Sequence, residues 1–247
     1  GVVASLFGCY LCWAELVVTT GLVTGVLRAG AGGRLIMRLL AATSPDARGL
    51  VTEAGETVGQ ISVSGTLGFL IFAALPLALS ASLAFAAVHR WLPDGRLTGA
   101  FFGLLLLIAA STRLEPLRAT NPDFVLLGPA WAALLTFGLL VLAEGMAIAA
   151  FMGWYSRRLP LARRNRKVLA RYALTGATLA LTGPIGALVL ALALAGAGVI
   201  ALAGQIVPNL ARWWLSNRVT TAGRVVLAGG ALLALPGFVT AIGDILP

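Results

Sequence analysis

Long apolar segments without charged side chains run through most of this chain. The longest, residues 172–211, has no Asp, Glu, Lys or Arg in 40 positions. A stretch of about 18 or more such residues is long enough to cross a hydrocarbon layer roughly 30 Å thick. The composition agrees, because 11% of the 247 residues are charged, against about 25% in soluble domains. The sequence therefore excludes a water-soluble globular protein and predicts a polytopic integral membrane protein.

Six segments have the composition of a transmembrane helix, and they predict an all-α bundle in a single transmembrane domain. In chain order they are residues 2–27, 65–88, 97–112, 124–154, 173–203 and 225–245. The third has only 16 residues and needs its flanks to span the bilayer. As one helix, the 40-residue run would be about 60 Å long, twice the hydrocarbon thickness. We therefore expect the fifth span to end near residue 203.

Residues 30–60 are predicted to contain interfacial helices outside the membrane core. Arg34 and Arg38 lie four residues apart among leucines, which is typical of an amphipathic helix in the interface. Ser44-Pro45-Asp46 is a start signal for a second short helix. In the alternative, the first span continues through Arg28 toward Leu40. That arrangement costs several kcal/mol unless the buried arginine is paired.

Residues 205–222 are predicted to form a second interfacial segment before the last span. Pro208-Asn209 interrupts the apolar run, and Trp213 and Trp214 follow beside Arg212. Tryptophan next to arginine is typical of a helix anchored at the membrane surface.

The segment 157–171 contains seven cations and no acid. They are Arg157, Arg158, Arg163, Arg164, Arg166, Lys167 and Arg171. Because short basic loops stay on the cytoplasmic side, this density predicts a cytoplasmic loop. Alternation then places both termini and residues 89–96 inside, and the loops 28–64, 113–123 and 204–224 outside, in a bacterial-type plasma membrane.

The formal charge of +9 is interpreted as attraction to anionic lipid head groups, because the cations lie between apolar runs and form no soluble domain. Nucleic acid is not expected as a partner. The basic loop 157–171 is the candidate docking surface for anionic lipids or for an acidic protein subunit.

Small residues at helical spacing predict close helix packing. Gly21 and Gly25 form one such pair, and Gly99 and Gly103 form another. Gly145, Ala149 and Gly153 form a third line. In lipid, such positions let two backbones approach closely and gain dispersion contacts.

Glu15 and Glu144 are the only charges deep inside predicted spans. An ionised carboxylate there costs at least about 2.5 kcal/mol, so each is expected inside the bundle. One interpretation is a proton- or cation-coupled site on which both acids converge. The other is a protonated glutamate that hydrogen-bonds to a neighbouring helix and holds the packing.

One histidine and a pair of cysteines are further candidates for chemistry. His89 follows the second span, where it has the chemistry to ligate a haem or pigment bound with another subunit; an interfacial histidine is the ordinary interpretation. Cys9 and Cys12 have a C-x-x-C spacing, but no second cysteine pair is present to pass electrons on. No metal-binding spacing and no cofactor motif occurs in the sequence.

Two functions remain open from the sequence. The first is a noncatalytic permease-like or accessory subunit of a larger membrane complex. The second is a stand-alone small transporter or channel in which Glu15 and Glu144 couple to protons or cations. No catalytic constellation supports an enzyme.

Overall fold

The computed structural model describes residues 2–53, 57–60, 62–95, 97–118, 120–159 and 216–246, with a few single positions between 191 and 199. These residues are helical without any strand, apart from one isolated bridge between Val51 and Thr57. Most of the predicted fifth span, Trp213, Trp214 and the cations from Arg163 to Arg171 lie outside the described residues.

The first helix is longer than predicted. α1 (Val2–Thr24) continues through a π-helical segment, η1 (Gly25–Gly30), into α2 (Ala31–Thr43) without a break. The expected separate interfacial helix after residue 28 is therefore not found, and the alternative of a continuing helix agrees with the structure. Arg28 is exposed, while Arg34 donates from Nη2 to Thr66 Oγ1 at 3.1 Å.

The end of α2 also differs from the prediction. The hydroxyl of Ser44 donates to the carbonyl of Leu40 at 2.9 Å and caps no following helix. Only a 3-10 turn, η2 (Pro45–Ala47), follows, in place of the expected second short helix.

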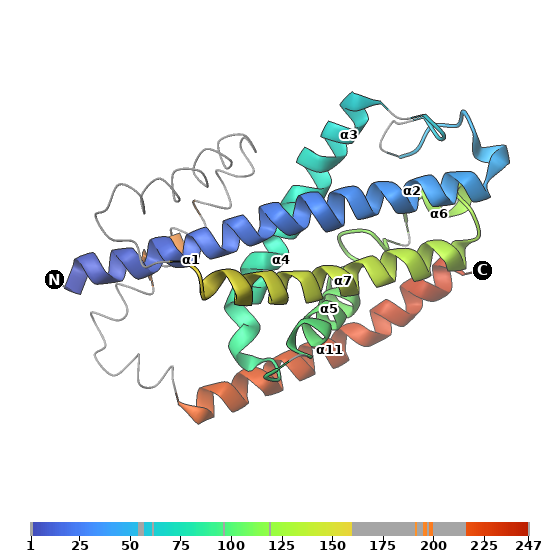
Figure 1. Cartoon of the computed structure of the whole chain (residues 1–247). Helices are drawn as coiled ribbons and strands as arrows, with labels where there is room; N and C mark the ends of the chain where they lie inside the picture. Colours follow the sequence, from blue (N-terminus) through green and yellow to red (C-terminus); the bar gives the residue numbers. More distant parts are fainter. Residues whose placement is uncertain are drawn as a thin grey trace.

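The second long helix runs from α3 (Val63–Phe69) through the π-helical η3 (Leu70–Ala74) into α4 (Leu75–Val88) and the 3-10 turn η4 (His89–Trp91). The Ser62 hydroxyl begins it by accepting a hydrogen bond from the amide of Gly65 at 2.9 Å. α4 crosses α1 steeply (Figure 1). At this crossing a Cβ on Gly21 would lie 2.8 Å from Leu79 Cα, so the predicted small-residue contact is confirmed.

The third predicted span is short in the structure. α5 (Thr98–Ala109) has 12 residues and is about 18 Å long, less than the hydrocarbon thickness. The chain then turns, and the buried Ser111 donates its hydroxyl to the carbonyl of Leu107 at 2.5 Å. An early turn that satisfies its polar groups inside the protein explains why this helix stops.

α6 (Asp123–Leu126) and α7 (Ala130–Ser156) divide the fourth predicted span into two helices. Gly128 separates them with a φ of +64°, a conformation that disfavours side chains other than glycine's. A Cβ at Gly128 would also lie 3.0 Å from the hydroxyl oxygen of Thr43. The chain therefore bends where it passes the end of α2.

α5 and α7 pack through their small residues, as the spacing predicted. A Cβ on Gly103 would lie 2.7 Å from the carbonyl oxygen of Leu142, and a Cβ on Gly145 would lie 2.4 Å from Gly103 Cα. Gly153 takes no part, because a Cβ there meets no atom within 4 Å. The two backbones therefore approach as closely as glycine permits.

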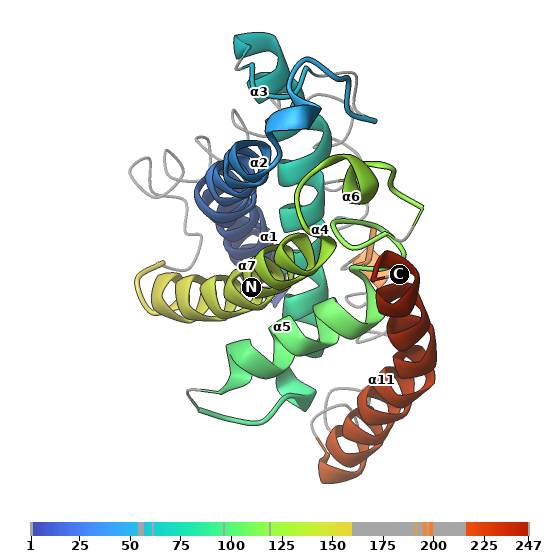
Figure 2. The ribbon, with the colours of Figure 1, turned by 90° about the vertical axis from the view of Figure 1, so that its right-hand side faces the viewer.

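The last described helix, α11 (Asn217–Ile245), is a bowed ribbon that passes through Pro236 without ending there (Figure 2). Its first turns lie beside η4, where Arg90 Nη2 donates to Thr220 Oγ1 at 3.2 Å. A Cβ on Gly223 would lie 2.4 Å from the ring of Trp91, so only glycine fits under this indole.

The structure brings together two loops that the sequence predicts on opposite sides of the membrane. Arg90, within residues 89–96, is in contact with Thr220, within residues 204–224. The two termini, predicted on one side, lie at opposite ends of the molecule (Figure 1). The sides of the membrane on which these loops and termini lie stay predictions.

A hydrophobic cap closes the end of the molecule at which α2 and α11 finish. Its buried residues are Leu40, Ala47, Val58, Leu117, Phe124, Leu127, Ala133 and Ile245. Arg118 holds the two long loops together, with ion pairs to Glu53 at 2.5 Å and to Glu115 at 3.0 Å. Hydrogen bonds from Arg118 hold the pKa of the exposed Glu53 carboxyl below its usual value.

Four helical segments of the described residues are long and apolar enough to cross a membrane. They are Cys12–Thr43, Val63–Trp91, Ala130–Ser156 and Asn217–Ile245. The chain is therefore a helical membrane protein.

Candidate functional site

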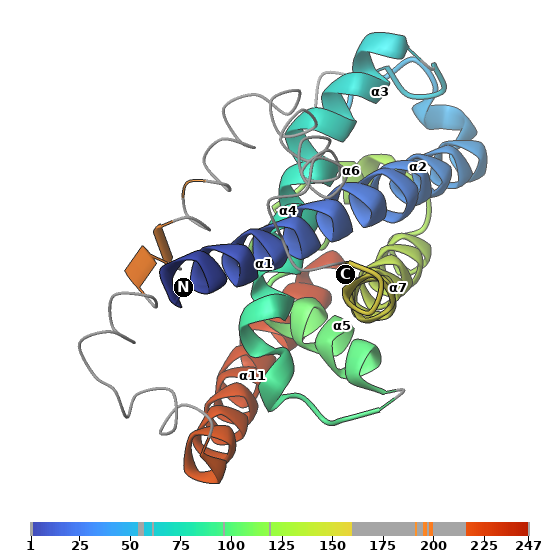
Figure 3. The same ribbon diagram turned by 60° about the vertical axis from the view of Figure 1, so that its left-hand side comes forward.

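α1 with its extension α2 packs antiparallel to α7 (Figure 1). Figure 3 views α7 nearly end-on, with α1 and α2 passing beside it. This interface holds both intramembrane carboxylates. Contacts follow one another along the pair. Tyr155 of α7 reaches Glu15 near the middle of α1, Glu144 lies near Thr24, and Leu140 meets Gly32. Residue numbers therefore rise along α1 and α2 while they fall along α7, as they do in an antiparallel helix pair.

The carboxylate of Glu15 is buried and hydrogen-bonded. Its side chain is 4% exposed. Oε1 accepts hydrogen bonds from Thr19 Oγ1 at 3.0 Å and from the Tyr155 hydroxyl at 3.1 Å. Tyr155 therefore ties α7 to α1, which is the arrangement expected of a glutamate that holds helix packing.

The carboxylate of Glu144 is buried without such support. The residue is 8% exposed, and neither Oε1 nor Oε2 has a hydrogen-bond partner in the described part of the chain. The Thr24 hydroxyl and the Arg28 guanidinium are close enough to act on its charge. The hydroxyl of Thr24 is itself buried and does not reach hydrogen-bond geometry.

Glu15 and Glu144 do not converge on one site. Tyr155, which binds Glu15, follows Glu144 by 11 residues on α7, or about 16 Å of helix. The two carboxylates therefore lie at different positions along the same interface. Glu15 belongs to a hydrogen-bonded cluster, and Glu144 has no hydrogen-bond partner among the described residues.

Other buried hydroxyls also differ in whether they have a hydrogen-bond partner. Thr20 and Ser82 are fully buried, and their oxygens lack hydrogen-bond partners among the described residues. Thr136 instead donates to the carbonyl of Ala132 at 2.7 Å within its own helix. Together with Glu144, these two unsatisfied hydroxyls come from α1, α4 and α7, three helices that are in contact with one another.

The remaining candidate residues have ordinary surroundings. His89 is exposed, and its Nδ1 lies 2.9 Å from the carbonyl oxygen of Ala86. Arg157 is exposed, and the guanidinium of Arg158 lies over the ring of Trp154 at 4.3 Å. Cys12 is half-buried in α1, and the side chain of Cys9 lies outside the described residues. No group of three metal-ligating side chains occurs in the described ranges.

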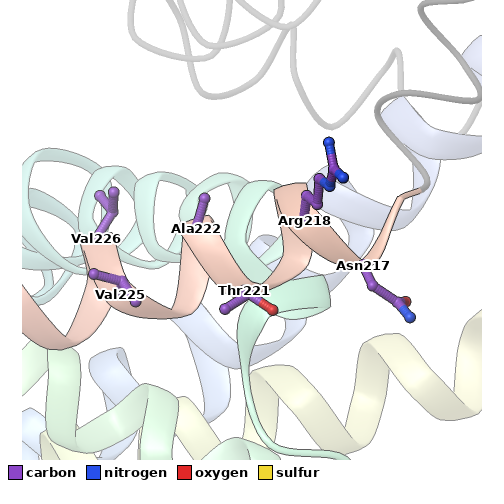
Figure 4. Close-up of a pocket in the computed structure, with 6 residues that line it drawn as sticks. All are labelled: Asn217, Arg218, Thr221, Ala222, Val225 and Val226. Atoms are coloured by element: carbon purple, nitrogen blue, oxygen red, sulfur yellow. The ribbon is translucent and has the colours of Figure 1, made fainter.

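Two hollows accompany α11. One is lined by Asn217, Arg218, Thr221, Ala222, Val225 and Val226 (Figure 4). All six described lining residues come from α11, so this hollow has no second wall in the described structure and defines no site. The other is a groove between α4, α5 and α11, with Arg113 at its margin.

The partner of Glu15 was missed by sequence reasoning. Tyr155 belongs to an apolar helix end and carries no signal beyond its spacing of 11 residues, about three turns, from Glu144. That spacing places the two residues on one face of α7, but only the packing of α7 on α1 shows which helix this face meets.

Comparisons with protein-family models, with curated proteins and with solved structures give no match to this chain. The fold and the interface between α1 and α7 therefore carry the functional argument.

Proposed function

We propose that the protein is a small proton-coupled membrane transporter and that Glu144 is its proton-binding group. The observation that carries the proposal is the unsatisfied carboxyl of Glu144 at the centre of the helix bundle. Buried polar groups in native proteins nearly always have partners, and the exceptions call for an explanation. Ionisable residues inside a membrane are typical of proton and ion pathways.

The contrast with Glu15 supports this assignment. Both carboxylates are similarly buried, yet Glu15 accepts two hydrogen bonds and Glu144 accepts none. A residue retained only for packing gains from a partner. A residue that must release and regain a proton needs an environment in which its protonated and its deprotonated form are both accessible.

The neighbour Arg28 favours a proton over a metal cation. Its guanidinium acts on the Glu144 carboxylate, and a fixed positive charge repels a second cation at the same carboxylate. A neutral carboxylic acid suffers no such repulsion.

Carbodiimide labelling tests the proton site directly. A hydrophobic carbodiimide reacts with protonated carboxyl groups in the membrane, and we expect pH-dependent modification of Glu144, located by peptide mass spectrometry. Vesicles with the wild-type protein should also dissipate an imposed pH gradient or couple it to uptake of a solute. Glu144→Gln should lose both properties, whereas Glu15→Gln keeps the transport.

Two results would overturn the proposal. One is a Glu144 side chain that stays unreactive at every pH at which the protein is folded. The other is transport that persists in Glu144→Gln.

A second candidate is a noncatalytic subunit of a larger membrane complex. Leu233 and Leu232 of α11 are 84% and 68% exposed, and this apolar surface suits a second membrane protein as well as lipid. Native mass spectrometry after gentle solubilisation separates the candidates. Copurified protein subunits favour the complex, and a single particle with proton-coupled activity favours the transporter.

We also propose that the basic segment 157–171 faces the cytoplasm and binds anionic lipid, in a bacterial-type plasma membrane. Its first two members, Arg157 and Arg158, are exposed. The substitution Arg164→Cys should then give a thiol that an impermeant reagent does not label in intact cells. Labelling at this position would indicate the opposite orientation.

A further inference from the structure

A groove of about 400 Å³ runs between α4, α5 and α11. Small residues form part of its lining, among them Ala84 of α4, Ala109 of α5, and Gly230 and Ala234 of α11. Larger apolar side chains, such as the buried Phe102, form the rest. α5 and α11 lie side by side in Figure 2 and are in contact. The groove is therefore apolar along its length and has walls from three helices.

Arg113 is the one charged residue among the described residues that line this groove. It follows the end of α5, where its Nη1 donates to the carbonyl of Ala109 at 2.8 Å. Its Nη2 lies near Gly237 of α11, 3.9 Å from the position of a Cβ there. Arg113 forms no ion pair within the described ranges. An uncompensated cation therefore stands at the margin of an apolar groove.

We propose that the groove binds one anionic phospholipid, with an acyl chain between α5 and α11 and the phosphate at Arg113. The charge is complementary, because a guanidinium binds phosphate oxygens with two parallel hydrogen bonds. The groove supplies apolar contact, and basic pockets between transmembrane helices recognise acidic head groups. The site is separate from Glu144, so this proposal stands independently of proton transport.

The chain offers matched variants for the test. Gly229 and Gly230 are neighbours on α11, and a Cβ at either meets no atom within 4 Å. Only Gly230 lines the groove, so Gly230→Leu should fill it and Gly229→Leu should not. Arg113→Gln removes the charge at the groove, and Arg48→Gln removes an exposed charge elsewhere.

The experiment measures lipid retained by the purified protein. Each variant is placed in nanodiscs of phosphatidylglycerol and phosphatidylethanolamine, then analysed by native mass spectrometry, with size exclusion confirming the folded particle. We expect the wild type to retain phosphatidylglycerol preferentially. Arg113→Gln should lower that preference about tenfold, the size of one charge-assisted hydrogen bond. Gly230→Leu should lose the bound lipid, and both controls should keep it.

Three outcomes would overturn the proposal. The first is a wild-type protein that retains lipid in the bulk ratio, which indicates annular lipid only. The second is a preference that survives in Arg113→Gln. The third is equal loss in Gly229→Leu and Gly230→Leu, which places the lipid outside the groove.

Discussion

The hydroxyl of Tyr155 donates a hydrogen bond to Oε1 of Glu15 at 3.1 Å, across 140 residues of sequence. This bond joins the first helix to the far end of α7. It gives Glu15 a partner on another helix, whereas Glu144 has no hydrogen-bond partner among the described residues.

Removal of the Tyr155 hydroxyl should destabilise the protein. Hydrogen bonds between transmembrane helices contribute about 0.6 kcal/mol on average and up to roughly 1.7 kcal/mol, so we expect Tyr155→Phe to fall in this range. Thermal unfolding in detergent measures it. Combined with Glu15→Gln, the effects should be non-additive; strictly additive losses would show that the two residues do not interact.

Substitution of Glu144 should have the opposite sign. Glu144→Leu removes an unsatisfied buried carboxyl, and we expect it to raise the free energy of unfolding by about 1–3 kcal/mol. Glu15→Leu should lower it, because Thr19 and Tyr155 lose their acceptor. A gain in stability with a loss of transport is typical of functional positions. Equal destabilisation by both substitutions would contradict the distinction between the two carboxylates.

The contact between α5 and α7 should tolerate no side chain at Gly103. A Cβ there would lie 2.7 Å from a backbone oxygen of α7, so Gly103→Ala must move the two helices apart and should cost about 1–3 kcal/mol. Gly153→Ala, on the opposing helix α7 but in open space, is the control and should be neutral or slightly stabilising. Unfolding in detergent again provides the measurement.

The start of α11 and the loop after α4 should lie on the same side of the membrane. The contact between Arg90 and Thr220 requires this, whereas the charge pattern predicts opposite sides. In a background with Cys9 and Cys12 replaced by alanine, cysteines at Asp94 and Asn217 should react alike with an impermeant thiol reagent. Opposite labelling would refute this direction of α11.

The ion pair between Glu53 and Arg118 should weaken in acid. The folded-state pKa of Glu53 is lowered by Arg118, so the pair stabilises loop docking above the unfolded pKa, about 4.3. This stabilisation is lost as the pH falls through the folded value. Limited pepsin digestion should therefore cut the loop of residues 44–53 increasingly below about pH 4. Arg118→Gln should expose that loop already at neutral pH, and Asp46→Asn should not.

Helix class and the small-residue contacts were predictable from the sequence, because both depend on local pattern. Gly99 and Gly103 were expected to support close packing, and they pack against α7. The boundary at residue 28 was wrong because the prediction assumed that Arg34 would find no partner. Thr66 and Phe69, on another helix, supply a hydrogen bond and a ring face to its guanidinium.

The candidate site was likewise predictable only in part. Scarcity of charge identified Glu15 and Glu144 as the two carboxylates that need explanation. Their different environments were not predictable, because the packing of α7 on α1 brings Tyr155 to Glu15 and Thr24 to Glu144.

The uncharged runs alone establish a helical membrane protein, since an apolar run of about 20 residues crosses lipid as a helix that satisfies its own backbone hydrogen bonds. Packing establishes which helices touch and which carboxylate has no hydrogen-bond partner among the described residues. Lipid accepts any apolar helix face almost equally, so hydropathy selects no neighbours. Close backbone contacts at glycines and a few interhelical hydrogen bonds select them instead.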